Sequence, residues 1–283
     1  MNGILIINKP KNITSRDVVN RVCNILNTKK VGHTGTLDPI AAGVLVLCVG
    51  NATKLVDLIT SSDKEYIASV KLGVLTDTLD ITGNILEKRK CSVLKDDLVN
   101  VLNSFIGEYY QEVPIYSAVK INGKKLYEYA RENKDVILPK RKVTIKSIEL
   151  LDFNKDEYKF KVVVSKGTYI RSLIKDINNK LGIIGSMSDL IRTRQGTFKL
   201  SEAYNINDIE NNNFEFIKVK DAIKDIKKVD IDDSLYNRIK HGQILENIYK
   251  DDIVVFMYNN ELIAIYKKYD KDESKIKPYK MFI

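Results

Sequence analysis

The stretch Val31-Gly32-His33-Thr34-Gly35-Thr36-Leu37-Asp38-Pro39 lies between a helical pattern and a fully apolar run. Its two glycines tolerate backbone angles that other residues resist, so they predict a sharp, close-packed loop. Its proline favours an extended backbone at the preceding residue. The sequence therefore predicts a rigid loop that presents His33 and Asp38. A functional loop and an ordinary glycine-rich turn both fit this pattern.

Length and charge limit the possible classes of protein. A chain of 283 residues that is 44% apolar can form one large domain or two smaller ones. The net charge of +9 is uneven, because residues 1–229 hold 37 Lys and Arg against 27 Asp and Glu, whereas residues 230–283 hold 9 against 10. The N-terminal part is therefore expected to bind a polyanion, and a nucleic acid fits better than a membrane surface because no basic amphipathic anchor is present.

Cysteines, histidines and apolar runs point to a cytoplasmic protein without a metal site. Cys23 and Cys48 lie in apolar patterns, and the three cysteines form no C-x-x-C pair, so reduced thiols are expected. Two histidines, His33 and His241, are too few for a typical metal site. The N-terminus lacks the pattern of a secretory signal, and no apolar stretch reaches the ~18 residues needed to span a bilayer.

Apolar periodicity predicts strands and helices in mixed order. Strands are predicted at 3–8, 44–49, 64–72, 143–153 and 157–164, with an extended segment at 113–121 and a hairpin across 253–267. Helices are predicted at 14–27, 51–59, 96–106, 124–131 and 168–181. Their end signals are a capping box of Thr14 and Asp17, an N-cap at Asn51 and a terminal Gly182, and Asn122-Gly123 has the type I′ hairpin signature.

Because strands and helices do not alternate strictly, we expect an α+β fold rather than a doubly wound sheet. The segment 218–233 is dense in charge and suggests a domain boundary, which we place after residue 230. The predicted hairpin beyond it indicates a small β-rich domain.

Three side chains could carry chemistry together. Asp38 can act as a nucleophile, as carboxylates do toward anomeric carbons, if a nearby cation keeps it ionised in a dry pocket. Arg171, in the first turn of the predicted helix after Gly167, is the candidate cation. Tyr66, at the start of a strand, can stack on a base that has left its helix. Taken singly, a surface arginine and a core-facing tyrosine are the better explanations of the last two.

Basic residues suggest a surface for phosphates. The stretches Lys120–Lys125 and Lys140–Lys146 are interleaved with Tyr116, Tyr127 and Tyr129, which could stack on bases. A solvated charged face explains either stretch alone.

In their order and spacing, these residues resemble the TruB family of pseudouridine synthases. The opening stretch, followed by Ala42-Gly43-Val44-Leu45 and Gly50-Asn51-Ala52-Thr53-Lys54, is similar to the catalytic signature of that family. Further matches are Ile7-Asn8-Lys9-Pro10, Asp63-Lys64-Glu65-Tyr66, Thr76-Asp77-Thr78-Leu79-Asp80, Pro114-Ile115-Tyr116-Ser117-Ala118-Val119-Lys120, Gly123-Lys124-Lys125-Leu126-Tyr127-Glu128-Tyr129-Ala130-Arg131, Ser165-Lys166-Gly167-Thr168-Tyr169-Ile170-Arg171 and Leu190-Ile191-Arg192-Thr193-Arg194. They run from about residue 3 to residue 200.

The resemblance implies a pseudouridine synthase catalytic domain at 1–230, with a mixed, largely antiparallel sheet and flanking helices. It implies an RNA-gripping insertion at about 115–142 and a compact, β-rich PUA-like domain at 231–283. The implied reaction is the isomerisation of uridine 55 in the T-loop of tRNA to pseudouridine, after the base is flipped out.

The resemblance also assigns roles to residues. Asp38 is the implied nucleophile, Arg171 its ion-pair partner, and Tyr66 the residue that stacks on the target base. The implied substrate-binding residues are His33, Tyr169, Leu190, Lys9 and Asp80. The implied RNA-backbone contacts are Lys120, Lys124, Lys125, Arg131 and Arg141.

The implied isomerisation moves no electrons on or off the substrate, so no cofactor and no metal are expected. The expected partner is tRNA, through its T-arm and also its acceptor stem, and the expected form is a monomer without an obligate protein partner. Attack at ribose C1′, attack at C6 and a glycal intermediate all remain open.

Two other classes remain as alternatives, and a third, a nucleotidyltransferase, is discounted. A guide-RNA-dependent enzyme of the dyskerin type is expected to have a longer PUA region and lysine-rich tails. A nucleotidyltransferase would need a second histidine where Thr36 stands. A non-catalytic RNA-binding protein or tRNA chaperone would not need both Asp38 and Arg171.

Overall fold

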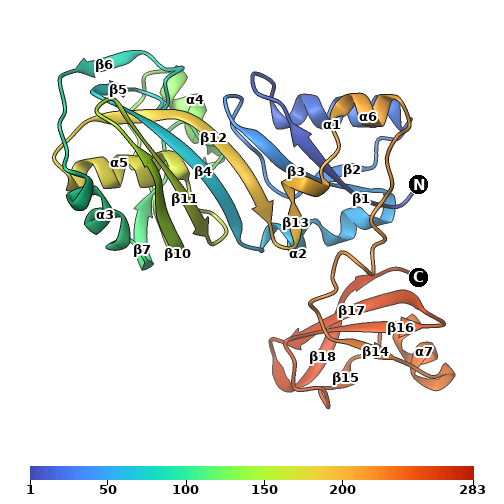
Figure 1. Cartoon of the computed structure of the whole chain (residues 1–283). Coiled ribbons are helices and arrows are strands. Elements are labelled where there is room, and N and C mark those ends of the chain that lie inside the picture. The colour runs from blue at the N-terminus through green and yellow to red at the C-terminus, as the bar shows by residue number, and fades with distance from the viewer.

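The computed structural model describes residues 1–283 and contains two large β-sheets, which lie in separate parts of the molecule (Figure 1). The first sheet is built from β1 (Gly3–Lys9), β2 (Val31–His33), β3 (Ala42–Val49), β4 (Lys64–Leu72), β7 (Gly107–Glu112), β10 (Lys140–Phe153), β11 (Glu157–Val164), β12 (Gly185–Gln195) and β13 (Phe198–Lys199). The second is built from β14 (Lys228–Asp230), β15 (Leu245–Glu246), β16 (Ile253–Tyr258), β17 (Glu261–Tyr269) and β18 (Asp272–Met281).

Two small hairpins and the helices complete the fold. The hairpins are β5 (Val74–Thr76) with β6 (Ile85–Lys88), and β8 (Lys120–Ile121) with β9 (Lys124–Lys125). The α-helices are α1 (Ser15–Ile25), α2 (Val56–Thr60), α3 (Lys95–Asn103), α4 (Leu126–Arg131), α5 (Ile170–Lys180), α6 (Ile206–Glu210) and α7 (Asp233–Lys240). Two 3₁₀ helices are η1 (Gly50–Leu55) and η2 (Leu200–Glu202).

The first sheet consists of two halves joined by a short parallel contact. Its main strand order is β1-β3-β12-β4-β11-β10-β7. Strands β3 and β12 are parallel and share only the residue pairs Ala42–Ile191 and Gly43–Arg192, whereas the other neighbours are antiparallel. The predicted α+β fold with a mixed, largely antiparallel sheet is therefore confirmed.

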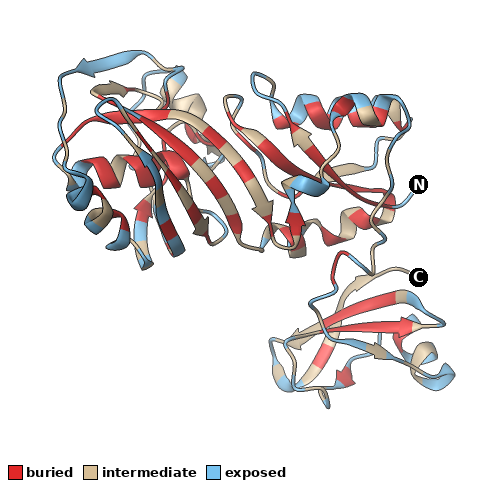
Figure 2. Ribbon diagram, viewed as in Figure 1, coloured by how far each residue is buried: buried red, intermediate tan, exposed pale blue.

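Each half of the sheet has its own helices (Figure 1). Helices α3 and α5 cover the β4–β10–β11–β12 half, and the apolar core between them includes Leu98, Phe160 and Leu173. On the other half, α1 and α6 pack over β1 and β3. Figure 2 shows that the central strands are buried along most of their length. The sheet is therefore a rigid base for the loops that leave it.

Local end signals agree with the sequence predictions. The capping box of Thr14 and Asp17 opens α1, as predicted. Gly182 follows α5 with φ +68°, and Asn122 and Gly123 both have positive φ in the two-residue turn between β8 and β9. These three signals depend mainly on neighbouring residues, so the sequence alone predicts them.

Two local predictions were wrong. The segment 113–121 is a bent loop over most of its length instead of an extended strand, and only Lys120 and Ile121 pair, in β8. Asn51 caps no helix: η1 begins one residue earlier without a side-chain cap, and the Asn51 side chain accepts a hydrogen bond from Lys30 Nζ. At both places tertiary contacts, rather than the local sequence, determine the backbone conformation.

The second sheet is small, curled and β-rich, consistent with the predicted PUA-type domain. Its strand order is β14-β16-β17-β18-β15, with α7 beside it. Buried residues of this sheet, Val255, Met257 and Ile265, share one apolar cluster with Ile4 and Val44 of the first sheet. The two sheets are therefore joined by a continuous core.

The cysteines are unpaired, as expected: Cys48 is buried, and Cys23 and Cys91 are partly buried. No helix of the structure is both long and apolar enough to cross a membrane.

Candidate active site

The predicted loop connects β2 to β3 and is bonded to buried side chains along its length. Gln195 Nε2, fully buried, donates to Thr34 O at 3.0 Å and to Thr34 Oγ1 at 2.8 Å. Ser15 Oγ donates to Leu37 O at 3.1 Å and accepts from Leu37 N at 2.8 Å. Gly35 turns the loop with φ +141°. The hydrogen bonds from Gln195 and Ser15 therefore fix the backbone on both sides of the turn at Gly35.

Lys9 holds the end of the same loop. Its side chain is fully buried, and Nζ donates to Pro10 O and Ile13 O at 2.8 Å and to Pro39 O at 3.4 Å. Burial lowers the pKa of the Lys9 ammonium to about 8, although the nearby Asp38 carboxylate acts in the opposite direction. Lys9 therefore uses all three N–H groups of its ammonium to hold backbone carbonyls at the end of the loop. It does not line the pocket beside Asp38.

Asp38 and Arg171 form a two-pronged ion pair. Arg171 Nε lies 2.9 Å from Asp38 Oδ2, and Nη2 donates to Oδ1 at 3.2 Å. The Arg171 side chain is 6% exposed and that of Asp38 is 36% exposed. Fork-to-carboxylate contacts of this kind combine charge with directional bonding. The arginine is therefore part of the protein interior, whereas the carboxylate faces the outside.

The remaining donors of Arg171 reach two further loops. Nη1 donates to Thr78 O and Nη2 to Tyr116 O, both at 3.0 Å. Asp80, almost fully buried, shapes the first of these loops, since its Oδ1 accepts from Thr78 Oγ1 at 3.0 Å and from Thr82 N at 2.9 Å. Asp80 thus acts on the site through Thr78 and Arg171 and does not line the pocket.

A pocket of about 110 Å³ opens beside the Asp38 carboxylate. Its walls are Thr36, Leu37, Asp38, Tyr66, Thr168, Tyr169, Ile170, Arg171 and Leu190. Five of the predicted site residues, Asp38, Tyr66, Tyr169, Arg171 and Leu190, thus meet in one place, although they come from one loop, two strands and the start of α5. The walls are apolar and aromatic apart from the ion pair and two threonines, which suits a flat ring.

Tyr66 is both a core residue and a wall of the pocket. It is 8% exposed, packs in the apolar core of the larger sheet half and pairs with Arg192 across β4 and β12. The core-facing position expected of a strand tyrosine is therefore present, and the same residue also lines the pocket beside Asp38. Its stacking on a base stays a prediction.

Sequence reasoning did not identify the group that positions Tyr169. Gln111, on β7 and 1% exposed, accepts from Tyr169 N at 2.7 Å and donates to Tyr169 O at 3.1 Å. The same amide also donates to Tyr109 Oη. No spacing rule reveals such a contact, since β7 and the start of α5 are 58 residues apart in sequence. Ser15 and Gln195 were missed for the same reason.

His33 lies in β2, two residues before Gly35, and is not in the pocket wall. Burial lowers the pKa of its imidazole, and the positive charges of Arg16 and Arg192 lower it further. Its Nδ1 is buried without a hydrogen-bond partner. A neutral ring at this place is suited to packing against apolar or aromatic groups rather than to pairing with phosphate.

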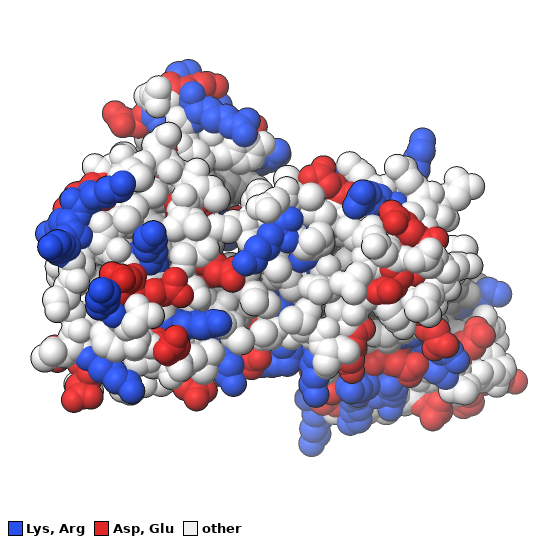
Figure 3. All heavy atoms as spheres, turned by 45° about the horizontal axis from the view of Figure 1, so that its top comes forward, with Lys and Arg blue, Asp and Glu red and all other residues white.

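All the predicted RNA-backbone residues lie within residues 115–142, the segment predicted to be an RNA-gripping insertion. Lys124 forms an ion pair with Glu132 and lies over the Tyr129 ring, and Lys125 Nζ donates to Tyr127 Oη. Lys120, Arg131 and Arg141 are exposed and form no ion pair. Figure 3 shows Lys and Arg spread over much of one face with Asp and Glu between them. The cations are therefore distributed, and only some of them are free.

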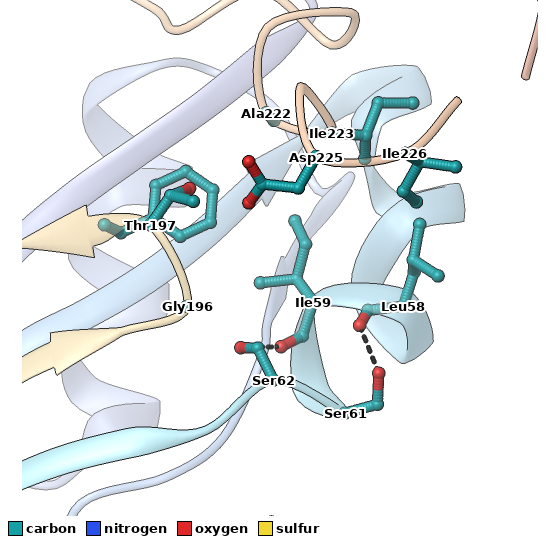
Figure 4. A pocket seen from close by; sticks show the side chains of 11 residues that line it. Leu58, Ile59, Ser61, Ser62, Gly196, Thr197, Ala222, Ile223, Asp225 and Ile226 are labelled. Carbon is teal, nitrogen blue, oxygen red and sulfur yellow. Dashed lines mark hydrogen bonds between the residues drawn. The ribbon is translucent and has the colours of Figure 1, made fainter. Parts of the chain in front are cut away.

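A second pocket, of about 220 Å³, lies where the segment 222–226 passes α2 and the turn between β12 and β13 (Figure 4). Ser61 Oγ and Ser62 Oγ, in its wall, donate to the carbonyls of Leu58 and Ile59, and Asp225 points into the space. It contains none of the predicted site residues. No group of three His, Cys, Asp or Glu side chains is arranged to hold a metal ion.

Comparison with known proteins agrees with this geometry. Residues 23–170 match the model of the TruB family pseudouridylate synthase N-terminal domain. A Clostridium tetani protein named tRNA pseudouridine synthase B is 42% identical over 277 residues, covering 95% of this chain and 96% of the relative. A Staphylococcus aureus protein of the same name is 43% identical over 302 residues, covering 99% of each.

Solved structures with a related fold include a protein complex and an RNA-protein particle. One is a Cbf5-Nop10-Gar1 complex, with TM-score 0.73 and 30% identity over 94% of this chain and 78% of that one. Another is an H/ACA RNP bound to a substrate RNA containing 2′-deoxyuridine, with TM-score 0.74 and 27% identity over 99% and 85%. By family model, near-full-length identity and fold, this chain belongs to the TruB family of pseudouridylate synthases and is an isomerase.

Proposed function

We propose that this protein converts uridine 55 in the T-loop of tRNA to pseudouridine, with Asp38 as the nucleophile. One observation carries the proposal: a partly exposed carboxylate, bonded through both oxygens to a buried arginine, faces a small pocket with aromatic and apolar walls. The names of the relatives, tRNA pseudouridine synthase B, support tRNA as the substrate class.

The pocket is suited to a uracil that has left its stack. A base in a folded RNA loop has to be flipped out, which costs a few kcal/mol. Tyr66, Tyr169 and Leu190 offer apolar contact to the flipped ring. His33, on the strand that leads into the loop, is proposed to pack against the bases that the flip displaces. Contacts of the RNA backbone with the protein offset the remaining cost.

The reaction exchanges one bond to the ribose for another. The N1–C1′ bond breaks, the uracil turns within the pocket, and a C5–C1′ bond forms while C5 loses its proton and N1 gains one. In the simplest route an oxygen of Asp38 attacks C1′ and later leaves it. Attack at C6 and a glycal route also employ this carboxylate, and Arg171 stabilises its negative charge in each case. Tyr66 is proposed to stack on the base and to relay a proton. Atoms and electrons balance without any oxidant, reductant or nucleotide.

We propose that the chain has two domains, which contact different parts of the tRNA. Residues 1–230 form the catalytic domain, and the insertion at about 115–142 grips the T-arm with its free cations. Residues 231–283 form the PUA-like domain and are proposed to lie beside the acceptor stem. We propose that the chain works in the cytoplasm as a monomer, without a guide RNA or protein partner. Its greater identity to the proteins named tRNA pseudouridine synthase B than to the Cbf5 chains supports this.

Tritium release tests substrate, chemistry and nucleophile together. Full-length tRNA labelled with [5-³H]uridine is incubated with the purified chain alone, and released tritium is compared with that from a tRNA in which position 55 is cytidine. Wild type should release one equivalent from the uridine-55 substrate and none above background from the control, and Asp38→Asn should release none from either. Equal release from both tRNAs would refute the assignment to uridine 55. A requirement for added guide RNA would indicate the dyskerin-type enzyme instead.

A further inference from the structure

Arg192 is a fully buried cation with no carboxylate partner. It lies on β12, two residues beyond the pocket residue Leu190, and is 1% exposed. No Asp or Glu lies within ion-pair distance of its guanidinium, in contrast to Arg171 and Arg194. A buried, unpaired charge is costly, so its retention requires that its donors be well satisfied.

The donors of Arg192 are satisfied by the backbone of the Asp38 loop. Nη2 donates to Gly35 O at 3.0 Å, and Nη1 lies 3.4 Å from Thr36 O. Nε donates to Val44 O at 2.6 Å, on the strand that continues from the loop. One planar group thus holds the chain before and after Asp38, with three N–H directions fixed relative to one another.

The backbone of Arg192 is in equally close contact with the strand after the loop. Arg192 pairs with Gly43 at the parallel joint between β12 and β3. A Cβ placed on Gly43, which has φ +102°, would lie 2.3 Å from Arg192 O. On its other side, Arg192 pairs with Tyr66 across β4. Arg192 therefore stands between the strand of Tyr66 and the loop of Asp38.

We propose that Arg192 is a positioning residue for the reaction: its guanidinium fixes the Gly35–Thr36 backbone and thereby the direction in which Asp38 presents its carboxylate. The inference rests on the proposed function of Asp38. It extends that function to a buried residue that is not part of the pocket wall. A shift of about 1 Å in a reacting group can cost about 10²-fold in rate.

The test compares Arg192→Lys with Arg194→Lys. A lysine keeps the charge at position 192, but its single ammonium cannot reach Val44 O and both loop carbonyls in the same geometry. Arg194 is the matched control, because it lies two residues further along the same strand, is 29% exposed and donates to Gly196 O, away from the loop. Single-turnover tritium release, the Kd for a T-arm stem-loop and the melting temperature are measured for both variants.

Arg192→Lys should lower the single-turnover rate by about 10²-fold, leave the Kd within about threefold of wild type and remain folded at the assay temperature. Arg194→Lys should match wild type in all three. A single-turnover rate of Arg192→Lys within threefold of wild type would overturn the inference, as would an equal loss of rate and binding.

A spectroscopic readout separates this inference from the proposed function. The chain has only two histidines, and His33 leads directly into the loop, whereas His241 lies after α7. In Arg192→Lys the imidazole NMR signals of His33 should shift while those of His241 stay in place. If wild type released no tritium from uridine 55, the proposed function would fail, and the His33 signals would still report whether Arg192 holds the loop. Unmoved His33 signals would reject that role.

Discussion

Arg171 meets Asp38 with two nitrogens, Nε at 2.9 Å from Oδ2 and Nη2 at 3.2 Å from Oδ1. The two residues are 133 positions apart in sequence, so the pair exists only when both halves of the first sheet are assembled. Because Arg171 also donates to Thr78 O and Tyr116 O, the same side chain joins the carboxylate to the base of the insertion. Folding and assembly of the site are therefore one event.

Replacement of Arg171 by lysine should lower the single-turnover rate by roughly 10²–10³-fold, because an ammonium cannot hold both carboxylate oxygens or reach both carbonyls. Binding of the T-arm should change little. Lys175→Met is the control, since Lys175 lies one turn further along α5 in a half-exposed ion pair with Glu112, a kind of pair that contributes about 0–1 kcal/mol to stability. If Arg171→Lys and Lys175→Met had the same rate, the role of Arg171 as ion-pair partner would be excluded.

Asp38→Asn should reduce tritium release by ~10⁴-fold or more, as expected when a nucleophile is lost. The Kd for the T-arm should stay within a few-fold, because Asp38 is one wall residue of a larger pocket. The variant leaves Arg171 without its counter-charge, so a lower melting temperature is also expected. Asp57→Asn provides a surface control, since Asp57 is 71% exposed and pairs only with Lys280. Turnover of Asp38→Asn near the wild-type rate would show that another group is the nucleophile.

Gly43→Ala should destabilise the fold by about 3 kcal/mol or more, because strain and steric overlap add at this position. An alanine there would have φ +102° and a Cβ 2.3 Å from Arg192 O. Gly107→Ala separates the two effects: Gly107 has φ +114°, but no heavy atom beyond its chain neighbours lies within 4 Å of the Cβ that an alanine would add. Urea unfolding of both variants measures the difference. Equal losses would mean that backbone strain alone matters and that the joint between β3 and β12 can open.

The sequence predicted the proposed catalytic residues better than the residues that position them. Asp38, Tyr66 and Arg171 were each ambiguous alone, and the order of the surrounding motifs identified them as a set. Ser15 and Gln111 have no such signal, because a hydroxyl or amide that bonds a distant backbone follows no sequence period. The hydrogen bonds that position the Asp38 loop and Tyr169 can therefore be identified only in the folded structure.

Polar residues with distant partners also explain the errors in the predicted secondary structure. Strand β12 was not recognised because it buries Ser186, Arg192 and Gln195, which break the apolar pattern of a central strand. The segment 113–121 was expected to be extended, but it bends so that Tyr116 O meets Arg171. In both cases the polar groups that mislead the pattern belong to the site or to its support, which is where local rules are expected to fail.

The buried Lys64 should make stability depend on pH. Its Nζ donates to Thr60 O and Ser62 O at 2.6 Å, and burial lowers the pKa of its ammonium from 10.5 to about 8. Below pH 8 both folded and unfolded chains hold this proton. Between about pH 8 and 10.5 only the unfolded chain does, so the free energy of unfolding rises with pH in that window.

Urea unfolding at pH 7 and pH 10 measures this effect by comparing wild type with Lys64→Met. The stability of wild type relative to the variant should increase between the two values by on the order of 1–3 kcal/mol. Lys71→Met, an exposed position seven residues along the same strand, should show no such change. A constant difference between wild type and Lys64→Met would mean that Lys64 keeps its proton in the folded protein.

Free and paired cations of the insertion should differ in their contribution to RNA binding. Lys120 and Arg141 are exposed and form no ion pair, so each can release one counterion from an RNA phosphate. Removal of either should weaken T-arm binding and reduce the slope of log Kd against log salt by about 0.7–0.9. Lys124 already interacts with Glu132 and the Tyr129 ring, and Lys134 holds the same Glu132 oxygen at 2.9 Å, so Lys124→Ala removes a cation and leaves the Glu132 carboxylate with Lys134 alone.

The salt dependence of Kd should therefore distinguish the paired Lys124 from the free Lys120 and Arg141. If Lys124 leaves Glu132 to bind a phosphate, its removal lowers the salt slope as much as removal of Lys120 does. If Lys124 stays with Glu132, Lys124→Ala should leave the slope almost unchanged and weaken binding uniformly, because Glu132 then has only Lys134 to compensate its charge. The double variant Lys124→Ala with Glu132→Gln should then restore binding, because it removes the carboxylate and also frees Lys134. Filter binding at four salt concentrations gives each slope, and no recovery in the double variant would assign Lys124 to the RNA.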